Sequence, residues 1–179
     1  NATNSKIELN GDQSIGIYTT GINSITNDGT VIIGNSTSQT QPGVGIYADN
    51  TGSSINNSGT INAGDNSIGI YNLNGSVTNL ANGTITAGNG GTGIYSDGGV
   101  ITLDINSSIA VGQNDAVGVY AVNQAGTVIN NSAVSVGNGS YGFVFTGTTS
   151  PVFLNNEPAT IGDNSIFVFA DSMLAADNS

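Results

Sequence analysis

Apolar and polar positions alternate along this chain in a short phrase that recurs at nearly constant spacing. The phrase joins an aliphatic residue, Gly, a second aliphatic residue and Tyr, as in Ile68-Gly69-Ile70-Tyr71. Six copies and a degenerate seventh end, at steps of 29, 24, 24, 25, 24 and 25 residues, on Tyr18, Tyr47, Tyr71, Tyr95, Tyr120, Val144 and Phe169. A fixed period of this size is typical of a solenoid, because a single coil cannot bury its apolar face alone.

One period, residues 67–91, contains three short segments of strand character. They lie at 68–71, around Val77 and at 84–87, and stretches rich in Gly and Asn separate them. Three strands per period predict an all-β fold, a right-handed parallel β-helix with a three-sided cross-section. We expect about 24–25 residues per coil and roughly six to seven coils, in one segment that covers residues 1–179.

The alternation also predicts which side chains face the core. In the third strand, the inward positions are Val31 and Ile33, Ile61 and Ala63, Ile85 and Ala87, Ile109 and Val111, and Val134 and Val136. The outward positions between them are Ile32, Asn62, Thr86, Ala110 and Ser135. In the first strand, strict alternation places both aliphatic residues around Gly in the core, and Gly and Tyr outside.

Polar residues recur at the corners between strands. One row consists of Asp12, Asp65, Asn89, Gln113, Asn138 and Asp163, and a second consists of Asp28, Ser58, Asn82, Asn106 and Asn131. Clustered oxygens could bind Ca²⁺, and Asp115 lies close to the first row. Amides separate most of the carboxylates, however, so the pattern favours ladders of Asx turns, and we predict no metal site.

Two segments depart from the period. Residues 34–43 form a longer loop between coils, and such loops often lie on the binding face of a solenoid. All five Phe residues fall in the last quarter of the chain, which predicts a bulkier core or an approaching end there.

Charge and missing residue types narrow the function. The chain has twelve acidic residues and one basic residue, Lys6, for a net charge of −11, and it lacks His, Cys and Arg. Binding of nucleic acid or of anionic membranes by this segment is therefore not expected, since both depend on Lys and Arg. A β-helical glycosidase needs two nearby carboxylates and a lyase needs a base, whereas the acidic residues here are scattered singly. We predict no catalytic residue and no cofactor.

The Tyr row is the strongest candidate for a binding site. Five tyrosines are expected to stack on one outer face: Tyr18, Tyr47, Tyr71, Tyr95 and Tyr120. Rigid amphipathic rings suit contact with sugars or with a protein partner. The alternative is that the rings only stabilise the solenoid by stacking on one another.

The repeat resembles a known family. The phrase Gly-Ile-Tyr and the run Ile-Asn-Asn-Ser-Gly-Thr-Ile-Asn-Ala-Gly at 55–64 are similar to the β-helical passenger domain of large type Va autotransporter adhesins of Gram-negative bacteria. The resemblance covers about residues 7–170. It implies a cell-surface location, tethered to the outer membrane through a barrel not present in this chain, and attachment to host-cell glycans or proteins or to other bacteria.

Three alternatives to an adhesin stay open from the residues. One is a purely structural spacer with no ligand of its own, and another is the β-helical lyase or glycosidase already considered. The third is an ice-binding solenoid, which needs regular Thr-x-Thr rows, and only Thr84 and Thr86 fit that pattern. The chain begins at Asn1 without an initiator Met or a signal peptide, so we expect a mature or excised segment of a longer protein.

Overall fold

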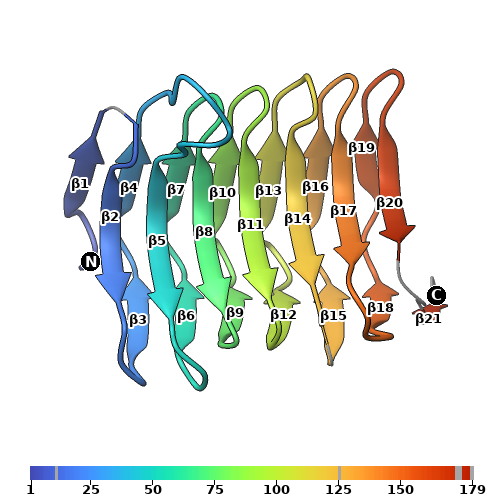
Figure 1. Ribbon diagram of the computed structural model, residues 1–179, viewed down its shortest axis with the longest axis horizontal. Coiled ribbons are helices and arrows are strands. Elements are labelled where there is room, and N and C mark those ends of the chain that lie inside the picture. Colours follow the sequence, from blue (N-terminus) through green and yellow to red (C-terminus); the bar gives the residue numbers. More distant parts are fainter. Residues whose placement is uncertain (11, 125, 172–174, 178–179) are drawn as a thin grey trace.

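The computed structural model is a parallel β-solenoid of about seven turns with about 25 residues per turn, described for residues 1–10, 12–124, 126–171 and 175–177. Each turn contributes one strand to each of three parallel sheets, and the two chain ends lie at opposite ends of the stack (Figure 1). This confirms the predicted fold class. Within the described residues, no helix is long and apolar enough to cross a membrane.

The three sheets have seven strands each. Sheet A contains β1 (Lys6–Leu9), β4 (Thr30–Ile33), β7 (Thr60–Ala63), β10 (Thr84–Ala87), β13 (Ser108–Val111), β16 (Ala133–Val136) and β19 (Ala159–Ile161). Sheet B contains β2 (Ile15–Thr19), β5 (Val44–Asp49), β8 (Ile68–Leu73), β11 (Thr92–Asp97), β14 (Val117–Val122), β17 (Tyr141–Thr146) and β20 (Ile166–Asp171). Sheet C contains β3 (Ser24–Asn27), β6 (Ser54–Asn57), β9 (Ser76–Asn79), β12 (Val100–Leu103), β15 (Thr127–Asn130), β18 (Val152–Asn155) and β21 (Ala175–Asp177).

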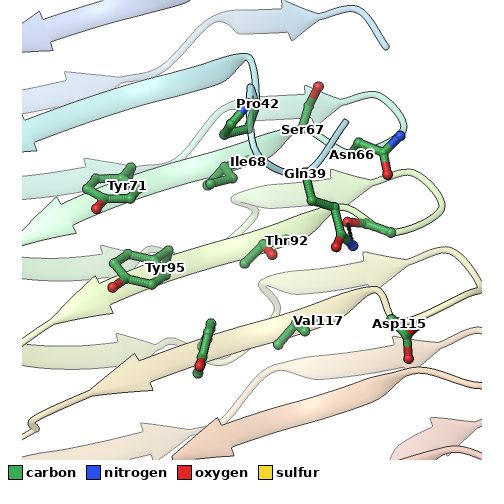
Figure 2. Close-up of a pocket in the computed structure, with 12 residues that line it drawn as sticks. Gln39, Pro42, Asn66, Ser67, Ile68, Tyr71, Thr92, Tyr95, Asp115 and Val117 are labelled. Atoms are coloured by element: carbon green, nitrogen blue, oxygen red, sulfur yellow. Dashed lines mark hydrogen bonds between the residues drawn. The ribbon is translucent and has the colours of Figure 1, made fainter. Parts of the chain in front are cut away.

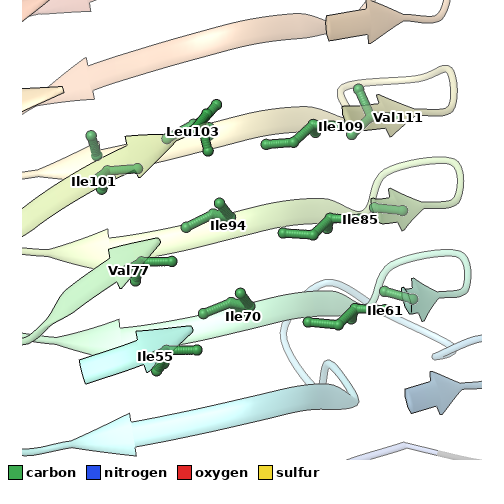
Figure 3. Packing of buried hydrophobic residues seen from close by; sticks show 14 of the residues in the cluster. Ile55, Ile61, Ile70, Val77, Ile85, Ile94, Ile101, Leu103, Ile109 and Val111 are labelled. Carbon is green, nitrogen blue, oxygen red and sulfur yellow. The ribbon is translucent and has the colours of Figure 1, made fainter. Parts of the chain in front are cut away.

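Sheet A shows the predicted inward and outward rows. Ile61 pairs with Ile85, which pairs with Ile109, and all three are buried. The other predicted inward residues of this sheet are buried as well, and the residues between them are half-buried or exposed. Like residues therefore stack in columns along the axis and meet the aliphatic columns of the other two sheets in one continuous core (Figure 3).

Sheet B departs from strict alternation at its glycine. A side chain on Gly69 would point inward, 2.6 Å from the carbonyl oxygen of Gly93 and 3.1 Å from Ile85 Cγ2. Gly69 and Ile70 are thus both buried, and Ile68 is turned to the outside with Tyr71. The prediction that both aliphatic residues around Gly point inward, with Gly outside, is wrong for the first of them and for Gly.

The same geometry repeats on six coils. The glycines are Gly16, Gly45, Gly69, Gly93, Gly118 and Gly142. At each of them, an added Cβ would lie 2.5–2.6 Å from a carbonyl oxygen of the next coil, closer than such atoms can approach. Only a residue without a side chain fits, because the backbone of the next coil occupies the space that a side chain would need.

Sheet C carries a buried ladder of amides that the sequence analysis did not predict. Asn27 Nδ2 donates to Asn57 Oδ1 at 2.7 Å, and Asn57 Nδ2 donates to Asn79 Oδ1 at 2.8 Å. All three side chains are fully buried. Leu103 takes the next position, and Asn130 Nδ2 resumes the ladder by donating to Asn155 Oδ1 at 2.8 Å. The amides thus satisfy one another across coils, as buried polar groups must.

The predicted Asx ladder at the corner between sheets A and B is confirmed. Asp65 Oδ1 accepts a hydrogen bond from the backbone N–H of Asn89 at 2.7 Å. Asn89 Oδ1 in turn accepts one from the N–H of Gln113 at 2.9 Å, and Asn138 Oδ1 accepts one from Asp163. The side chains of Asp65, Asn89 and Asn138 therefore each hold the turn of the following coil, which explains why acidic and amide residues are interchangeable here.

Three of the five phenylalanines, Phe143, Phe145 and Phe153, make the core bulkier toward the last coils, as predicted, whereas Phe169 is exposed. Phe143 and Phe145 are fully buried, and Phe153 packs against both at centroid distances of 4.7 and 5.4 Å. Phe145 stands in register with the small buried residues Ala121 and Ser96 of the preceding coils. The bulky rings thus occupy space that smaller side chains line elsewhere.

Replacement of Gly69 by Ala is expected to destabilise the fold by about 1–3 kcal/mol or more, because the new methyl group would collide with a backbone carbonyl that cannot rotate away. Gly21→Ala is the matched control, since its Cβ would meet only the flexible side chain of Asn23. Chemical denaturation of both variants measures the effect. Equal midpoints for Gly69→Ala and the unmodified chain would contradict the inward orientation.

Replacement of Asn57 by Ala is expected to cost about 2–4 kcal/mol, because Asn27 Nδ2 and Asn79 Oδ1 would both lose a buried partner. Asn56→Ala on the outer face of the same strand should change stability by less than about 0.5 kcal/mol. Thermal melts followed by circular dichroism compare the two. Similar losses for both variants would argue against an energetically important ladder.

Candidate functional site

The predicted Tyr row lies on the outer face of sheet B. It consists of Tyr18, Tyr47, Tyr71, Tyr95 and Tyr120, in register from coil to coil. Ring centroids are 4.8 Å apart for the pair 47/71 and 4.6 Å apart for 71/95, with interplanar angles of 5° and 12°. At the ends of this stack, the 18/47 pair is tilted by 56° and the 95/120 pair by 88°. The five tyrosines thus share one outer face, as predicted, and the predicted stacking holds for Tyr47, Tyr71 and Tyr95.

Stacking changes the electrostatics of the phenols. Burial of Tyr95 by its neighbours, then the negative charge that Tyr71 and Asp97 place nearby, raises its pKa from 10.0 to about 12. Burial also raises the pKa of Tyr47, with a contribution from Asp49. These rings therefore stay uncharged over the whole physiological range, as donors and acceptors of hydrogen bonds.

The long loop at 34–43 folds back over the solenoid and reaches two coils along it (Figure 1). Its start is anchored by Thr37, whose N–H and hydroxyl both bind the carboxylate of Asp12. Ser36 Oγ, beside it, lies 2.9 Å from Ser67 Oγ on the next coil, and Gln39 Nε2 donates to the carbonyl oxygen of Gly90 at 2.7 Å. Three separate coils thus hold the loop in one place.

A groove of about 390 Å³ lies between this loop and the Tyr row. One wall consists of Tyr71, Tyr95 and Tyr120. Figure 2 shows Tyr71 and Tyr95 on this wall, with Gln39 and Pro42 of the loop on the other side. The outward row Ile68, Thr92 and Val117 lies between them on β8, β11 and β14. The corner residues Asn66 and Asp115 complete the rim. The volume falls in the range of about 300–1,000 Å³ that is usual for ligand sites.

Sequence reasoning located one wall of this groove and missed the rest. Three of the five predicted tyrosines line it, whereas Tyr18 and Tyr47 extend the row beyond it. Ile68 and Val117 line the groove, so their predicted place in the core is wrong. The signal against that assignment was available, since the equivalent positions hold Thr92 and Tyr141, which are poor core residues.

The carboxylates of Asp12 and Asp65 in the corner row accept hydrogen bonds. Those from Thr37 hold the pKa of Asp12 below its usual value, and Asp65 accepts the N–H of Asn89. Among the residues that the structure describes, no three acidic side chains gather as a metal site would require. The row is therefore explained by its turns, and Asp115 alone contributes a carboxylate to the groove.

Comparisons with protein-family models, with curated proteins and with solved structures found no match to this chain. The groove must therefore be interpreted from its own chemistry. It offers aromatic and aliphatic surface beside amide, hydroxyl and carboxylate groups, and a nearby loop that is already fixed in place. These are the properties of a binding site for a small polar ligand or for part of a larger one.

Unfolding should become easier in strong alkali because of Tyr95. The folded chain holds its neutral phenol up to a pKa of about 12, against 10.0 without the neighbours, so this contribution to stability is complete below pH 10 and is lost as the pH rises from 10 to 12. Titration of tyrosinate absorbance should show a late step that Tyr95→Phe removes. If Tyr95→Phe instead removes a step near pH 10, the raised pKa of Tyr95 is contradicted.

Proposed function

We propose that this chain is a segment of a cell-surface adhesin, a rigid stalk that also presents a lateral binding site. The observation that carries the proposal is the groove between the Tyr row and the loop at 34–43. A spacer has no need of a loop that three coils hold across a groove from an outward aromatic row. Fixing the loop before a ligand arrives lowers the entropy lost on binding, so the arrangement suits recognition.

The rest of the molecule suits a stalk. Each coil pairs with the next in all three sheets, so the length of such a stack grows with the number of repeats while its cross-section stays constant. The resemblance to autotransporter passengers supports display on the outer surface of a Gram-negative bacterium, as part of a longer protein. The partners would be glycans or proteins on host cells or the surface of another bacterium.

Charge supports this choice of partners. The net charge of −11 is combined with a single basic side chain, Lys6, which already forms an ion pair with Glu8. Nucleic acids and anionic lipid surfaces would meet repulsion and no compensating contact. We also propose that the segment binds without catalysis, since its groove combines one carboxylate with no basic side chain.

A purely structural spacer is the second candidate, and one observation favours it. The faces of Tyr47, Tyr71 and Tyr95 are turned toward one another, so these rings already have partners without any ligand. Aromatic pairs in such arrangements contribute about 0.5–1.5 kcal/mol beyond their buried area. The stack therefore has a structural use whether or not the row also binds.

The double variant Tyr71→Ser/Tyr95→Ser separates the two candidates. If the row is a contact surface, beads coated with this variant should lose most of their attachment to cultured epithelial cells or to bacteria, because two of the three rings in the Tyr wall of the groove are gone. Stability should fall by only about 1–3 kcal/mol, the loss of the aromatic pairs. Attachment is counted under the microscope, and stability is followed by thermal melts.

The matched control is Asn62→Ser/Thr86→Ser, which changes two outward residues on sheet A. It should retain attachment. If both double variants attach like the unmodified chain, or if the unmodified chain attaches to neither cell type, the binding proposal fails and the spacer interpretation stands.

A further inference from the structure

We propose that the groove binds an uncharged glycan, with Tyr120 as the ring on which a sugar stacks and Asp115 as an acceptor for its hydroxyl groups. This inference rests on the proposed function and specifies its ligand. It goes beyond the adhesin proposal because it excludes sialylated, sulfated and uronic-acid glycans as ligands.

The walls of the groove match the two surfaces of a sugar ring. Ile68, Val117 and Pro42 supply aliphatic surface, and the Tyr wall supplies aromatic surface. Thr92 adds a hydroxyl group between Ile68 and Val117, and Gln39 adds an amide on the loop side of the groove. A pyranose has C–H groups on its faces and hydroxyls around its edge, so it can satisfy both kinds of lining at once. A purely apolar ligand would leave the polar groups without partners, which is costly.

Tyr120 is the ring whose faces remain outside the stack. Tyr71 and Tyr95 stack face to face along the solenoid axis, and Tyr120 follows in register on the next coil. With an interplanar angle of 88°, it presents its edge to the face of Tyr95. The following position in the column is Val144, so no further ring covers it. An aromatic face with partial negative charge favours contact with C–H groups of a sugar.

Asp115 is held at the rim by its backbone. Its φ of 63° is in the left-handed region, and its N–H donates to the carbonyl oxygen of Gly139 at 2.9 Å. The side chain is exposed and lines the groove. A carboxylate accepts hydrogen bonds from hydroxyl groups, and these are shorter and stronger than bonds between neutral groups.

The charge of the groove decides between neutral and acidic glycans. Asp115 is its one charged side chain, and the single Lys of the chain lies on β1 in an ion pair with Glu8. An anionic sugar would meet repulsion from Asp115 and from the net charge of −11, with no cation to compensate. An uncharged sugar is repelled neither by Asp115 nor by the net charge of the chain.

An acidic groove could also attract a basic peptide, but the backbone argues against this occupant. Extended peptides commonly bind by adding a strand to a free sheet edge. The groove lies over the face of β8, β11 and β14, and each of these strands is paired on both sides. A peptide there would find no row of backbone partners, whereas a sugar needs none.

A glycan array tests the proposal, with the chain coupled to fluorescent beads so that many copies act together. The array carries neutral oligosaccharides such as lactose and N-acetyllactosamine, the same cores with sialic acid or sulfate, and a panel of Lys-rich peptides. We expect binding to at least one neutral core and a loss of at least about tenfold when that core carries an anionic group. Equal or stronger binding to the anionic forms would overturn the proposal.

Variants locate the site. Tyr120→Leu should weaken binding to the neutral core about tenfold, the equivalent of one aromatic contact. Asp115→Asn, which tolerates the same backbone conformation, should also weaken it. Phe169→Leu is the control, since Phe169 occupies the same column two coils farther along and does not line the groove. Unchanged binding by Tyr120→Leu, in a chain whose melting temperature is retained, would overturn the assignment.

The remaining outcomes separate this inference from the proposed function. If beads attach to cells but no glycan on the array is bound, the neutral-glycan proposal fails and the adhesin proposal stands. Binding to the Lys-rich peptides alone would assign the groove to a peptide. If neither cells, glycans nor peptides are bound, both proposals fail together.

Discussion

The close approach of one coil to the next at the inward glycines is the constraint on which the rest of this structure depends. The carbonyl oxygen of each following coil fills the space where a side chain would point, so Gly69 and its equivalents can only be glycine. The glycine and the aliphatic residue after it both face the core. Alternation is thereby shifted, and the residue before the glycine joins Tyr on the outer face.

The candidate groove is a consequence of that shift. Without it, Ile68 and Val117 would lie in the core, and the Tyr row would stand alone on its strand. With it, two outward rows run side by side along the axis, and the loop at 34–43 closes the other side. A backbone constraint that serves stability in every coil thus also creates the surface available for binding.

Register couples the coils through side chains as well. The buried amides of Asn27, Asn57 and Asn79 bond only because each stands directly above the next. The corner ladder through Asp65 and Asn89 depends on the same alignment. A shift of one residue in any coil would leave these polar groups without partners in the core or at the turns, so the ladders favour one register over its alternatives.

The sequence was sufficient for the fold and for part of the site. Local patterns within one strand or turn were enough to predict the period and the three strands per coil. They also predicted the core columns of sheet A and the outward Tyr row. They did not predict the shifted alternation around Gly69, because it arises from the backbone of a neighbouring coil. The buried amides were hidden since Asn is common in turns. The reach of Gln39 to Gly90 is a tertiary contact across 51 residues, which no local pattern encodes.

The orientation of the residue before each glycine is the most direct test of this account. A soluble paramagnetic agent broadens the NMR signals of methyl groups that lie near solvent and spares those in the core. The account predicts strong broadening for Ile68 and Val117 and little for Ile70 and Val119, their neighbours across the glycine. Equal protection of all four would show that strict alternation holds, and Ile68 and Val117 would then not line the groove.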